Sequence, residues 1–507
     1  MTASGSTLSS MSRNVLAAVR EYRGMYGWRL LSEFVELLAI DNDTRDPGAL
    51  RHNARAVATL FRERGAEMDV VELPDSAPLV VGRYPAAADA PTLGVYVHYD
   101  GQPADASSWR SPPYRPELRT YPDGRVVPIP GPGEPIDDDW RLYARSAADD
   151  KAPLIAILGA LDALRAADLP PYINLVFCFE GEEESGSPHL REYLETLRDQ
   201  LRADAWLICD GPVHQTGAPQ VVLGVRGYCG FELTIYGPVR ELHSGHYGNW
   251  VSNPALALAH VLASFKDEHG RVTVPGFYDD TRPPTPAALE ALADLPPVED
   301  ELLRELGLAA PEVPDSRLVN QLMTPSFNIR GLSAASVGDD RRNVIPSVAR
   351  ASIDIRLAAG DDAERMLRLI REHLAGLGYH VLDREPTLGE RREHPRLARM
   401  EAEPGYPAAR IPVETPIVAH LLDAVRRASG ETVVTMPTLG GSVPLHHFTE
   451  VLQAPAVILP IANADNSQHA ADENIRLGNL WYGVDLWSVL LGTPWPGHTG
   501  DVYSGAS

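Results

Sequence analysis

Three stretches of the chain are apolar runs of strand length that end in acidic or histidine residues. They read TLGVYVHYD at 92–100, INLVFCFEGEE at 173–183 and AWLICDG at 205–211. Their β-branched and aromatic residues predict buried strands. Segments with the apolar spacing of helices come between or before them, at 47–64, 152–167 and 188–202. Strands and helices therefore alternate along this part of the chain.

This alternation predicts the fold class, an α/β domain with a mainly parallel sheet flanked by helices. Strands that are apolar throughout are typical of a parallel sheet that is buried on both faces. In such a sheet, ligands bind beyond the carboxyl ends of the strands. The polar residues at the ends of the three runs should therefore gather at one edge: His98, Asp100, Glu183, Glu184 and Asp210.

The segment FEGEEESGS places four carboxylates within residues 180–184, where they repel one another. A divalent cation would turn this repulsion into coordination. The same segment can equally be the solvated start of a helix, because carboxylates favour the positive end of the helix dipole. His98 and Asp100 lie two apart on one face of an extended strand, so Asp100 can accept a hydrogen bond from a metal-binding imidazole.

Two later segments add residues of the same chemistry. Asp149 and Asp150 in ARSAADDKAP come immediately before an apolar helix, where either could instead be a helix cap. His469 follows another apolar strand, APAVILPI, and could instead be an ordinary loop histidine. Carboxylates and imidazoles together suit Zn²⁺, Mn²⁺ or Co²⁺, so the combined set favours a metal site.

A second, smaller domain is expected that is distinct from the parallel sheet. Two helices among short amphipathic strands are typical of a two-layer α+β arrangement, and residues 227–405 have this pattern. The stretch 275–316 mixes prolines with short amphipathic helices and would be an elaboration of this domain.

Composition and charge exclude several kinds of partner. The chain has 507 residues, of which 44% are apolar and 22% charged, as in ordinary globular proteins. Its 45 Lys and Arg against 69 Asp and Glu give a net charge of −24, which argues against nucleic-acid and anionic-membrane partners. Three cysteines without paired spacing argue against a disulfide framework. Since the sequence also lacks the apolar core of a signal peptide, we expect a cytoplasmic protein.

Eight motifs, each weak alone, follow one another in a specific order. They are VHYDGQP, ARSAADDKAP, FEGEEESGS, ICDG, ELHSGHYGN, RRNVIPSVARASIDIRL, LGGSVP and NSQHAADE. In this order the chain resembles the zinc metallopeptidase family of cytosolic nonspecific dipeptidases, carnosine dipeptidases, glutamate carboxypeptidases and aminoacylases. The resemblance spans nearly the whole chain, and HYDGQP with EGEEESGS is most similar to the dipeptidase branch.

The resemblance implies two Zn²⁺ per chain, with Mn²⁺ or Co²⁺ as possible substitutes. One ion would be held by His98, Asp149 and Asp210. The other would be held by Asp149, Glu184 and His469, so that Asp149 bridges the two. In the family the peptide bond after the bridging aspartate is cis, which implies a cis bond between Asp149 and Asp150.

The resemblance also implies roles for two acids beside the metal ligands. Glu183 matches the general base, and Asp100 matches the acid that orients His98. Glu180 and Glu182 match no residue that touches the metal, and they would support neighbouring groups or face solvent.

Residues 227–405 resemble the family's lid and dimerisation domain, which implies a homodimer. The resemblance also implies that this domain is inserted within the catalytic domain, which would comprise residues 1–226 and 406–507. His243 matches a histidine that reaches into the partner subunit's site and stabilises the oxyanion, although it could be a surface turn residue. Arg356 matches the arginine that binds the substrate's terminal carboxylate, although it could lie on a solvated strand face. Further substrate contacts would come from Asn343, Gly440, Gly441 and Ser442.

Departures from the family pattern leave the substrate open. Ala144 and Ala152 replace glycines near Asp149, and three histidines are unusual: His246, His446 and His447. The expected reaction is hydrolysis of the peptide bond in a dipeptide or similar small substrate with a free carboxylate. The alternatives are an N-acyl amino acid deacylase, an amidohydrolase of one specialised metabolite, and a non-catalytic metal-binding homologue.

Overall fold

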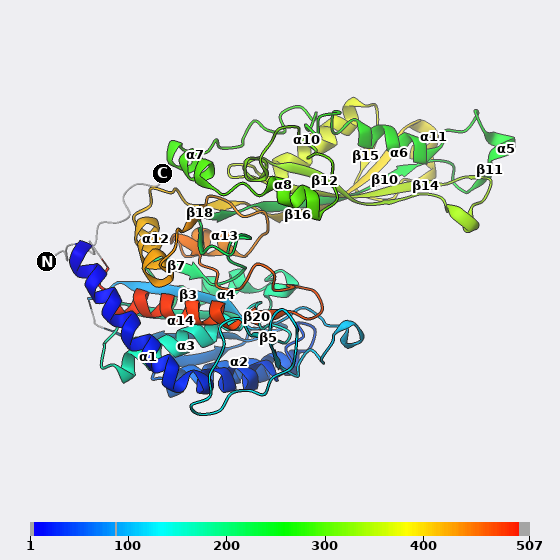
Figure 1. The fold of residues 1–507 in the computed structure, drawn as a ribbon. Helices are drawn as coiled ribbons and strands as arrows, with labels where there is room; N and C mark the ends of the chain where they lie inside the picture. The colour runs from blue at the N-terminus through cyan, green and yellow to red at the C-terminus, as the bar shows by residue number, and fades with distance from the viewer. Residues whose placement is uncertain (1–4, 87–88, 496–507) are drawn as a thin grey trace. The chain divides into compact units, whose positions relative to one another are not determined.

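The computed structural model of the protein describes residues 5–86 and 89–495. These residues divide into two compact units (Figure 1). Unit 1 comprises the described residues within Met1–Gly224, Ile411–Pro437 and Val443–Ser507. Unit 2 comprises Val225–Arg410 and Thr438–Ser442.

Unit 1 is built on an eight-stranded sheet. In spatial order its strands are β1 (Glu67–Val71), β2 (Leu79–Tyr84), β6 (Asn174–Glu180), β3 (Thr92–His98), β7 (Ala205–Ile208), β19 (Ala456–Ile458), β8 (Gln220–Val222) and β18 (Val434–Met436). The four central strands, from β6 to β19, are parallel, whereas β1 and β2 pair antiparallel at one edge. The predicted α/β class with a mainly parallel sheet is therefore confirmed.

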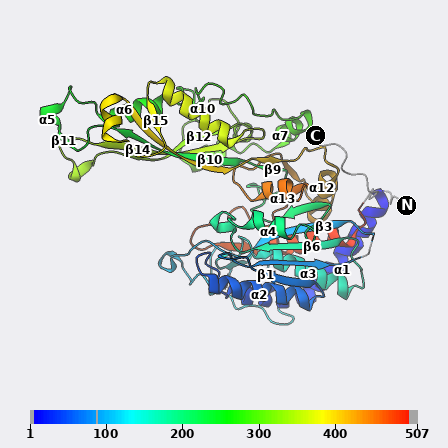
Figure 2. The same cartoon turned by 180° about the vertical axis from the view of Figure 1, so that it is seen from behind.

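Helices cover both faces of this sheet. One group shares a single core with it: α1 (Gly5–Leu38), α2 (Pro47–Glu63), α3 (Ala152–Ala166), α12 (Pro416–Ser429) and α14 (Leu477–Gly492). The other face carries α4 (Leu190–Thr196) and α13 (Leu445–Val451). Figure 2 shows the sheet between α2 and α3 on one side and α4 and α13 on the other.

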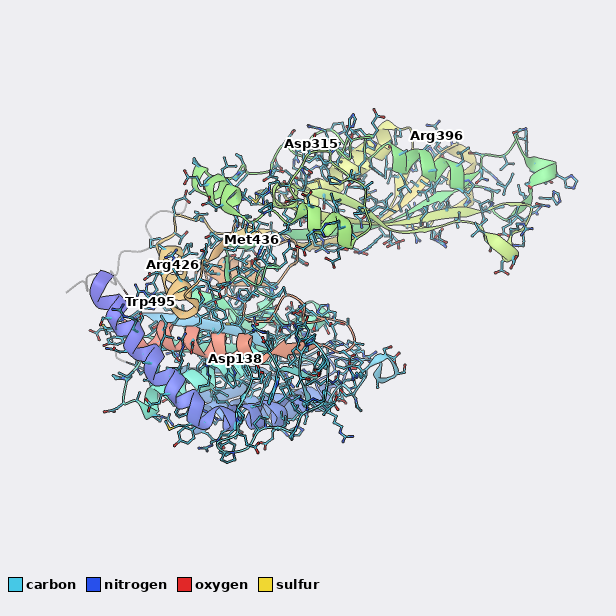
Figure 3. The ribbon with its side chains drawn as sticks, viewed as in Figure 1. Asp138, Asp315, Arg396, Arg426, Met436 and Trp495 are labelled. Carbon is cyan, nitrogen blue, oxygen red and sulfur yellow. The ribbon has the colours of Figure 1, made fainter. Side chains whose placement is uncertain are left out.

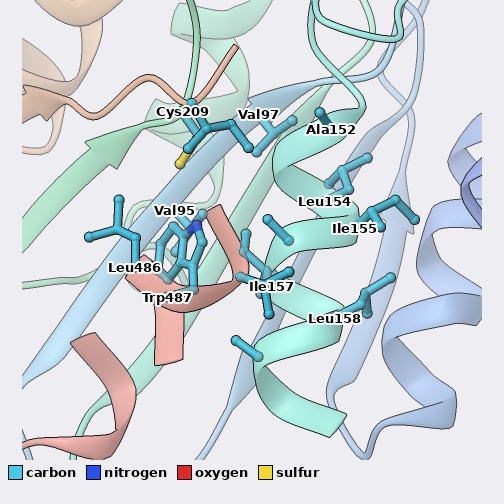
Figure 4. Packing of buried hydrophobic residues seen from close by; sticks show 14 of the residues in the cluster. Val95, Val97, Ala152, Leu154, Ile155, Ile157, Leu158, Cys209, Leu486 and Trp487 are labelled. Carbon is cyan, nitrogen blue, oxygen red and sulfur yellow. The ribbon is translucent and has the colours of Figure 1, made fainter. Parts of the chain in front are cut away.

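Strand β3 shows how alternating side chains fill both layers. Val95 and Val97 point toward α3 and toward Trp487 of α14 (Figure 4). Tyr96 between them packs on Phe448 of α13, with ring centroids 5.2 Å apart. All of these side chains are buried, which explains why the strand is apolar throughout.

Unit 2 is a five-stranded sheet with helices on one face. The strand order is β12 (Ser326–Ser333), β14 (Val348–Leu357), β10 (Gly227–Tyr236), β16 (Leu397–Tyr406) and β15 (His380–Leu382). All neighbours pair antiparallel except β15 and β16. Two helices, α6 (Pro254–Ala263) and α10 (Ala363–Gly376), bury their apolar sides against this sheet. This is the predicted two-layer α+β arrangement.

Shorter elements complete the two units. The remaining strands are β4 (Glu117–Arg119), β5 (Arg141–Tyr143), β9 (Gly224–Val225), β11 (Leu242–His243), β13 (Val344–Ile345), β17 (Ala409–Arg410) and β20 (Asn474–Arg476). The remaining α-helices are α5 (Ser244–Tyr247), α7 (Pro286–Asp294), α8 (Glu299–Glu305), α9 (Leu318–Leu322) and α11 (Leu388–Glu393). Across the described ranges, no helix combines the length and apolarity that crossing a bilayer requires.

Candidate metal centre

The carboxyl ends of three neighbouring strands of unit 1 bring the predicted residues together. His98 is the last residue of β3, and Asp210 lies two residues beyond the end of β7. Glu183 and Glu184 form a single 3-10 turn shortly after β6. Since β6, β3 and β7 are parallel neighbours, these side chains lie at one edge of the sheet, as the sequence predicts.

Six residues form two groups that could each hold a cation. The first is His98, Glu183 and Asp210, and the second is Asp149, Glu184 and His469. Within each group one ligand atom from every residue lies within 4.8 Å of the others. Asp149 links the groups, because its Oδ1 is 2.9 Å from Nε2 of His98 and its Oδ2 is 2.9 Å from Nε2 of His469.

Asp100 contacts both His98 and the turn that carries Glu183 and Glu184. Its side chain is fully buried, and Oδ1 lies 3.3 Å from Nδ1 of His98. The same carboxylate accepts hydrogen bonds from the backbone N–H groups of Glu183 at 3.2 Å and Glu184 at 3.1 Å. One acid therefore orients the imidazole and also holds the turn that carries both glutamates. The peptide bond between Asp149 and Asp150 is cis, as expected.

Burial and repulsion from neighbouring carboxylates shift the pKa values of the acids at the metal centre. Burial raises the pKa of Asp210 to about 7 and raises that of Glu183 well above its usual value. For Asp149 burial acts in the same direction, but the bonds to His469 and His98 outweigh it and lower the pKa. The bond to Asp149 in turn raises the pKa of His469 to about 10. A divalent cation would instead keep the carboxylates ionised and the imidazoles neutral, and this donor set fits one.

Glu473 is a site residue that the sequence reasoning missed. Its carboxylate is fully buried and accepts hydrogen bonds from the backbone N–H groups of Ser146, Ala148 and Asp149. It also pairs with the buried Arg145 at 2.7 Å. Burial raises the pKa of Glu473 to about 7. The residue lies inside the quoted motif NSQHAADE, but nothing local in the sequence connects it to the turn around Asp149.

Three further polar residues around the centre are buried. Lys151 donates from Nζ to Asn53 Oδ1 at 2.7 Å, and burial lowers its pKa to about 7. Glu180 accepts a hydrogen bond from the hydroxyl of Tyr96 at 2.5 Å, and burial raises its pKa to about 8. Asp150 is also buried, which raises its pKa well above the usual value. Glu180 therefore supports its neighbours rather than facing solvent.

Arg356 and Ser442 meet within unit 2. Arg356 lies on β14, with its guanidinium over the ring of Tyr228 at 5.4 Å and its Nε 3.3 Å from Asp354 Oδ1. Its Nη1 donates to the hydroxyl of Ser442 at 3.5 Å. The side chain is 34% exposed, so an anion in solvent can reach it. Gly440 and Gly441 come directly before Ser442 in the same loop.

His243 and Asn343 also meet in unit 2. His243 is exposed, caps α5 and accepts a hydrogen bond on Nδ1 from the N–H of Gly245. Its ring lies 4.6 Å from that of His246. The carbonyl of Asn343 accepts from the N–H of Ser244 at 3.0 Å, which joins the two segments. The other unusual histidines, His446 and His447, lie in α13 of unit 1 with rings 3.9 Å apart.

Comparison with known proteins agrees with this geometry. The sequence model of Peptidase family M20/M25/M40 matches residues 94–493. The chain belongs to this family. It is a metallopeptidase, and the resemblance drawn from the eight motifs is confirmed.

Relatives in this family are similar over almost their whole length. The Cys-Gly metallodipeptidase dug1 of Schizosaccharomyces pombe is 25% identical, covering 91% of this chain and 94% of the relative. The human Beta-Ala-His dipeptidase is 25% identical, covering 94% of this chain and 92% of the relative. The crystal structure of the M20 family metallo-carboxypeptidase Sso-CP2 from Sulfolobus solfataricus superposes with a TM-score of 0.75 at 25% identity, covering 92% of this chain and 98% of that one.

Proposed function

We propose that the protein is a two-zinc hydrolase that cleaves the peptide bond of dipeptides or similar small substrates with a free carboxylate. The observation that carries the proposal is the pair of ligand groups linked by the carboxylate of Asp149. The names of the similar dipeptidases support the substrate class. Mn²⁺ or Co²⁺ could take the place of Zn²⁺, because the donors are oxygen and imidazole nitrogen.

The proposed ligand sets are those that the family resemblance implies. One ion would be held by His98, Asp149 and Asp210, which is supported by the 2.9 Å between Asp149 Oδ1 and His98 Nε2. The other would be held by Asp149, Glu184 and His469, which is supported by the second ligand group. When bound, the ions would lower the pKa of water and polarise the scissile carbonyl. Glu183 would take the proton from the attacking water and pass it to the leaving amine. Burial raises the pKa of Glu183, which favours a group that has to hold a proton in the course of the reaction.

Substrate recognition is assigned to residues of unit 2. Arg356 would bind the terminal carboxylate through its planar fork, with Ser442 and the Gly440–Gly441 backbone adding polar contacts. Asn343 would add a further contact. His243, which is exposed, would stabilise the oxyanion in the site of a partner subunit. Residues 227–405 would then be the lid and dimerisation domain of a homodimer, and residues 1–226 with 406–507 the catalytic domain.

A cytoplasmic location goes with this function. The three cysteines, Cys178, Cys209 and Cys229, are buried and unpaired, as they would be in a reducing compartment.

The proposal is tested by a substrate screen and metal analysis on one sample of the purified protein. Free dipeptides are compared with N-acyl amino acids in the presence of Zn²⁺, Mn²⁺ or Co²⁺. We expect turnover of free dipeptides and about two ions per chain. Faster turnover of N-acyl amino acids would establish a deacylase instead. Metal binding without turnover of any member of the screen would favour the non-catalytic reading or a single specialised substrate.

A further inference from the structure

Unit 2 contains a mostly apolar cavity that the proposed reaction does not use. Its volume is about 930 Å³, within the range of ligand sites. It lies among α8, α9 and residues 266–272, and α8 belongs to the proline-rich stretch 275–316 that the sequence singles out. Asp315, labelled in Figure 3, marks the loop between the two helices. Six leucines dominate the lining: Leu302, Leu303, Leu306, Leu308, Leu318 and Leu322.

The mouth of the cavity is apolar as well. Leu306 is 62% exposed, and Leu308, two residues further on, is 53% exposed. Beside them, Lys266 pairs with Glu312 at 2.7 Å, so this rim carries no net charge. Further in, Val272 and Phe327 are buried. An apolar chain placed here would remove the exposed leucines from water.

One wall of the cavity carries a buried cation, Arg226. Arg226 is 6% exposed and lines the cavity. Its Nη2 donates to the carbonyl of Thr324 at 2.9 Å and to the hydroxyl of Ser326 at 2.8 Å. Its Nε has no hydrogen-bond acceptor, and no carboxylate among the described residues lies within ion-pair distance of the guanidinium. The Nε–H of Arg226 is therefore a buried donor without an acceptor.

The acids around Arg226 are engaged elsewhere. Asp354 pairs with Arg356, and Asp361 accepts from the hydroxyl of Thr281 at 2.8 Å. Burial and the charge of Arg356 lower the pKa of Arg226 to about 10, so it remains a cation at neutral pH. A buried charge without a counter-ion is costly, and an anionic ligand would relieve that cost.

We propose that this cavity binds a carboxylic acid with a linear apolar chain, its carboxylate on the guanidinium of Arg226 and its chain along the leucines. The carboxylate would accept from the guanidinium of Arg226, a charge-assisted bond of the strong kind. The cavity is lined by residues of unit 2, none of which belongs to the metal centre, and binding there would not depend on the proposed hydrolysis.

The test is isothermal titration of the metal-loaded, full-length protein with decanoate and with 1-decanol. We expect saturable binding of decanoate, and binding weaker by about tenfold or more in Arg226→Gln, with decanol affected by less than about twofold. The matched control is Arg271→Gln, an exposed cation lining the same cavity, which should leave decanoate binding unchanged. Equal affinity for decanoate and decanol in the unmodified protein would overturn the proposal, as would no saturable binding.

Two further variants test the metal centre as a rival site and the role of charge in the cavity. A carboxylate could bind at the metal centre, so His469→Ala should still bind decanoate with unchanged affinity; loss of binding there would overturn the proposal. If Arg226→Gln fails to fold, Leu306→Glu at the exposed mouth is compared with Leu306→Gln. The added negative charge should weaken decanoate binding several-fold more than the amide does. Equal affinities in this pair would also count against an anion in the cavity.

Discussion

The carboxylate of Glu473 accepts a hydrogen bond from the backbone N–H of Asp149 at 3.0 Å. The acid lies on a loop far along the chain, yet it sets the direction of the aspartate that links the two ligand groups. Its other oxygen holds the N–H of Ser146 and the guanidinium of Arg145. One buried side chain therefore fixes the geometry on which both proposed ion sites depend.

Replacing this acid should weaken metal binding. In Glu473→Gln the amide nitrogen would face backbone N–H donors, and Arg145 would be left buried without its counter-ion. We expect metal affinity to fall about 10–100-fold and the free energy of unfolding to fall by about 3–5 kcal/mol. Equilibrium dialysis with Zn²⁺ and chemical denaturation measure the two effects. Glu450→Gln is the control, because that acid is 46% exposed and its pair with Arg191 contributes under about 1 kcal/mol. Unchanged metal affinity in Glu473→Gln would contradict the positioning role.

The general base can be separated from the metal ligands by one substitution. Glu183→Gln should reduce kcat by at least about 10²–10⁴, because an amide cannot take the proton of the attacking water. Metal content, measured by mass spectrometry, should stay at about two ions per chain. Glu182→Gln is the matched control in the same segment, since that side chain accepts from the N–H of Ala77 instead. Joint loss of metal and turnover in Glu183→Gln would argue that Glu183 is a ligand rather than a base.

Arg356 should control substrate affinity more than the chemical step. Arg356→Lys keeps the charge but loses the planar fork, so KM for dipeptides should rise about 10-fold or more while kcat changes little. Arg350→Lys tests an exposed arginine on the same strand and should leave both constants unchanged. The unmodified protein should prefer dipeptides with a free C-terminal carboxylate over dipeptides with a C-terminal amide. This preference should be lost in Arg356→Lys. Equal loss for carboxylate and amide substrates would rule out the carboxylate contact.

His243 should act through a partner subunit if the homodimer proposal holds. His243→Ala should lower kcat by about 10²–10³, as removal of an oxyanion donor does. His246→Ala, which removes the neighbouring ring 4.6 Å away, is the matched control and should have a much smaller effect. Mixing His243→Ala with Glu183→Gln chains should restore about a quarter of the activity after random pairing, because each mixed dimer regains one complete site. No recovery in dimers shown to exchange would mean that His243 does not act across subunits.

The meeting of His98, Glu184 and Asp210 could be predicted because it depends on strand direction alone. Each apolar run ends at a polar residue, and parallel strands bring their carboxyl ends to one edge. The role of Glu473 could not be predicted, since it comes from three backbone N–H groups in a distant turn and has no local pattern. Helix α14 was also missed, because it is buried on nearly every side and so lacks the periodicity of an amphipathic helix.

The buried histidines of α13 predict how stability depends on pH. Burial lowers the pKa of His446 and His447 to about 4, and the charge of Arg191 acts in the same direction on both; Glu450 opposes it at His447. Unfolded histidines titrate near about 6.5, so the unfolded chain binds protons first as the pH falls. The contribution of the two neutral histidines to the free energy of unfolding is therefore full above about pH 6.5 and is lost as the pH falls toward 4. In His446→Gln the drop in unfolding free energy between pH 7 and 5 should shrink by about 1–2 kcal/mol, measured by chemical denaturation. His269→Gln, with a side chain 71% exposed, should keep the original drop; the same drop in His446→Gln would refute the assignment.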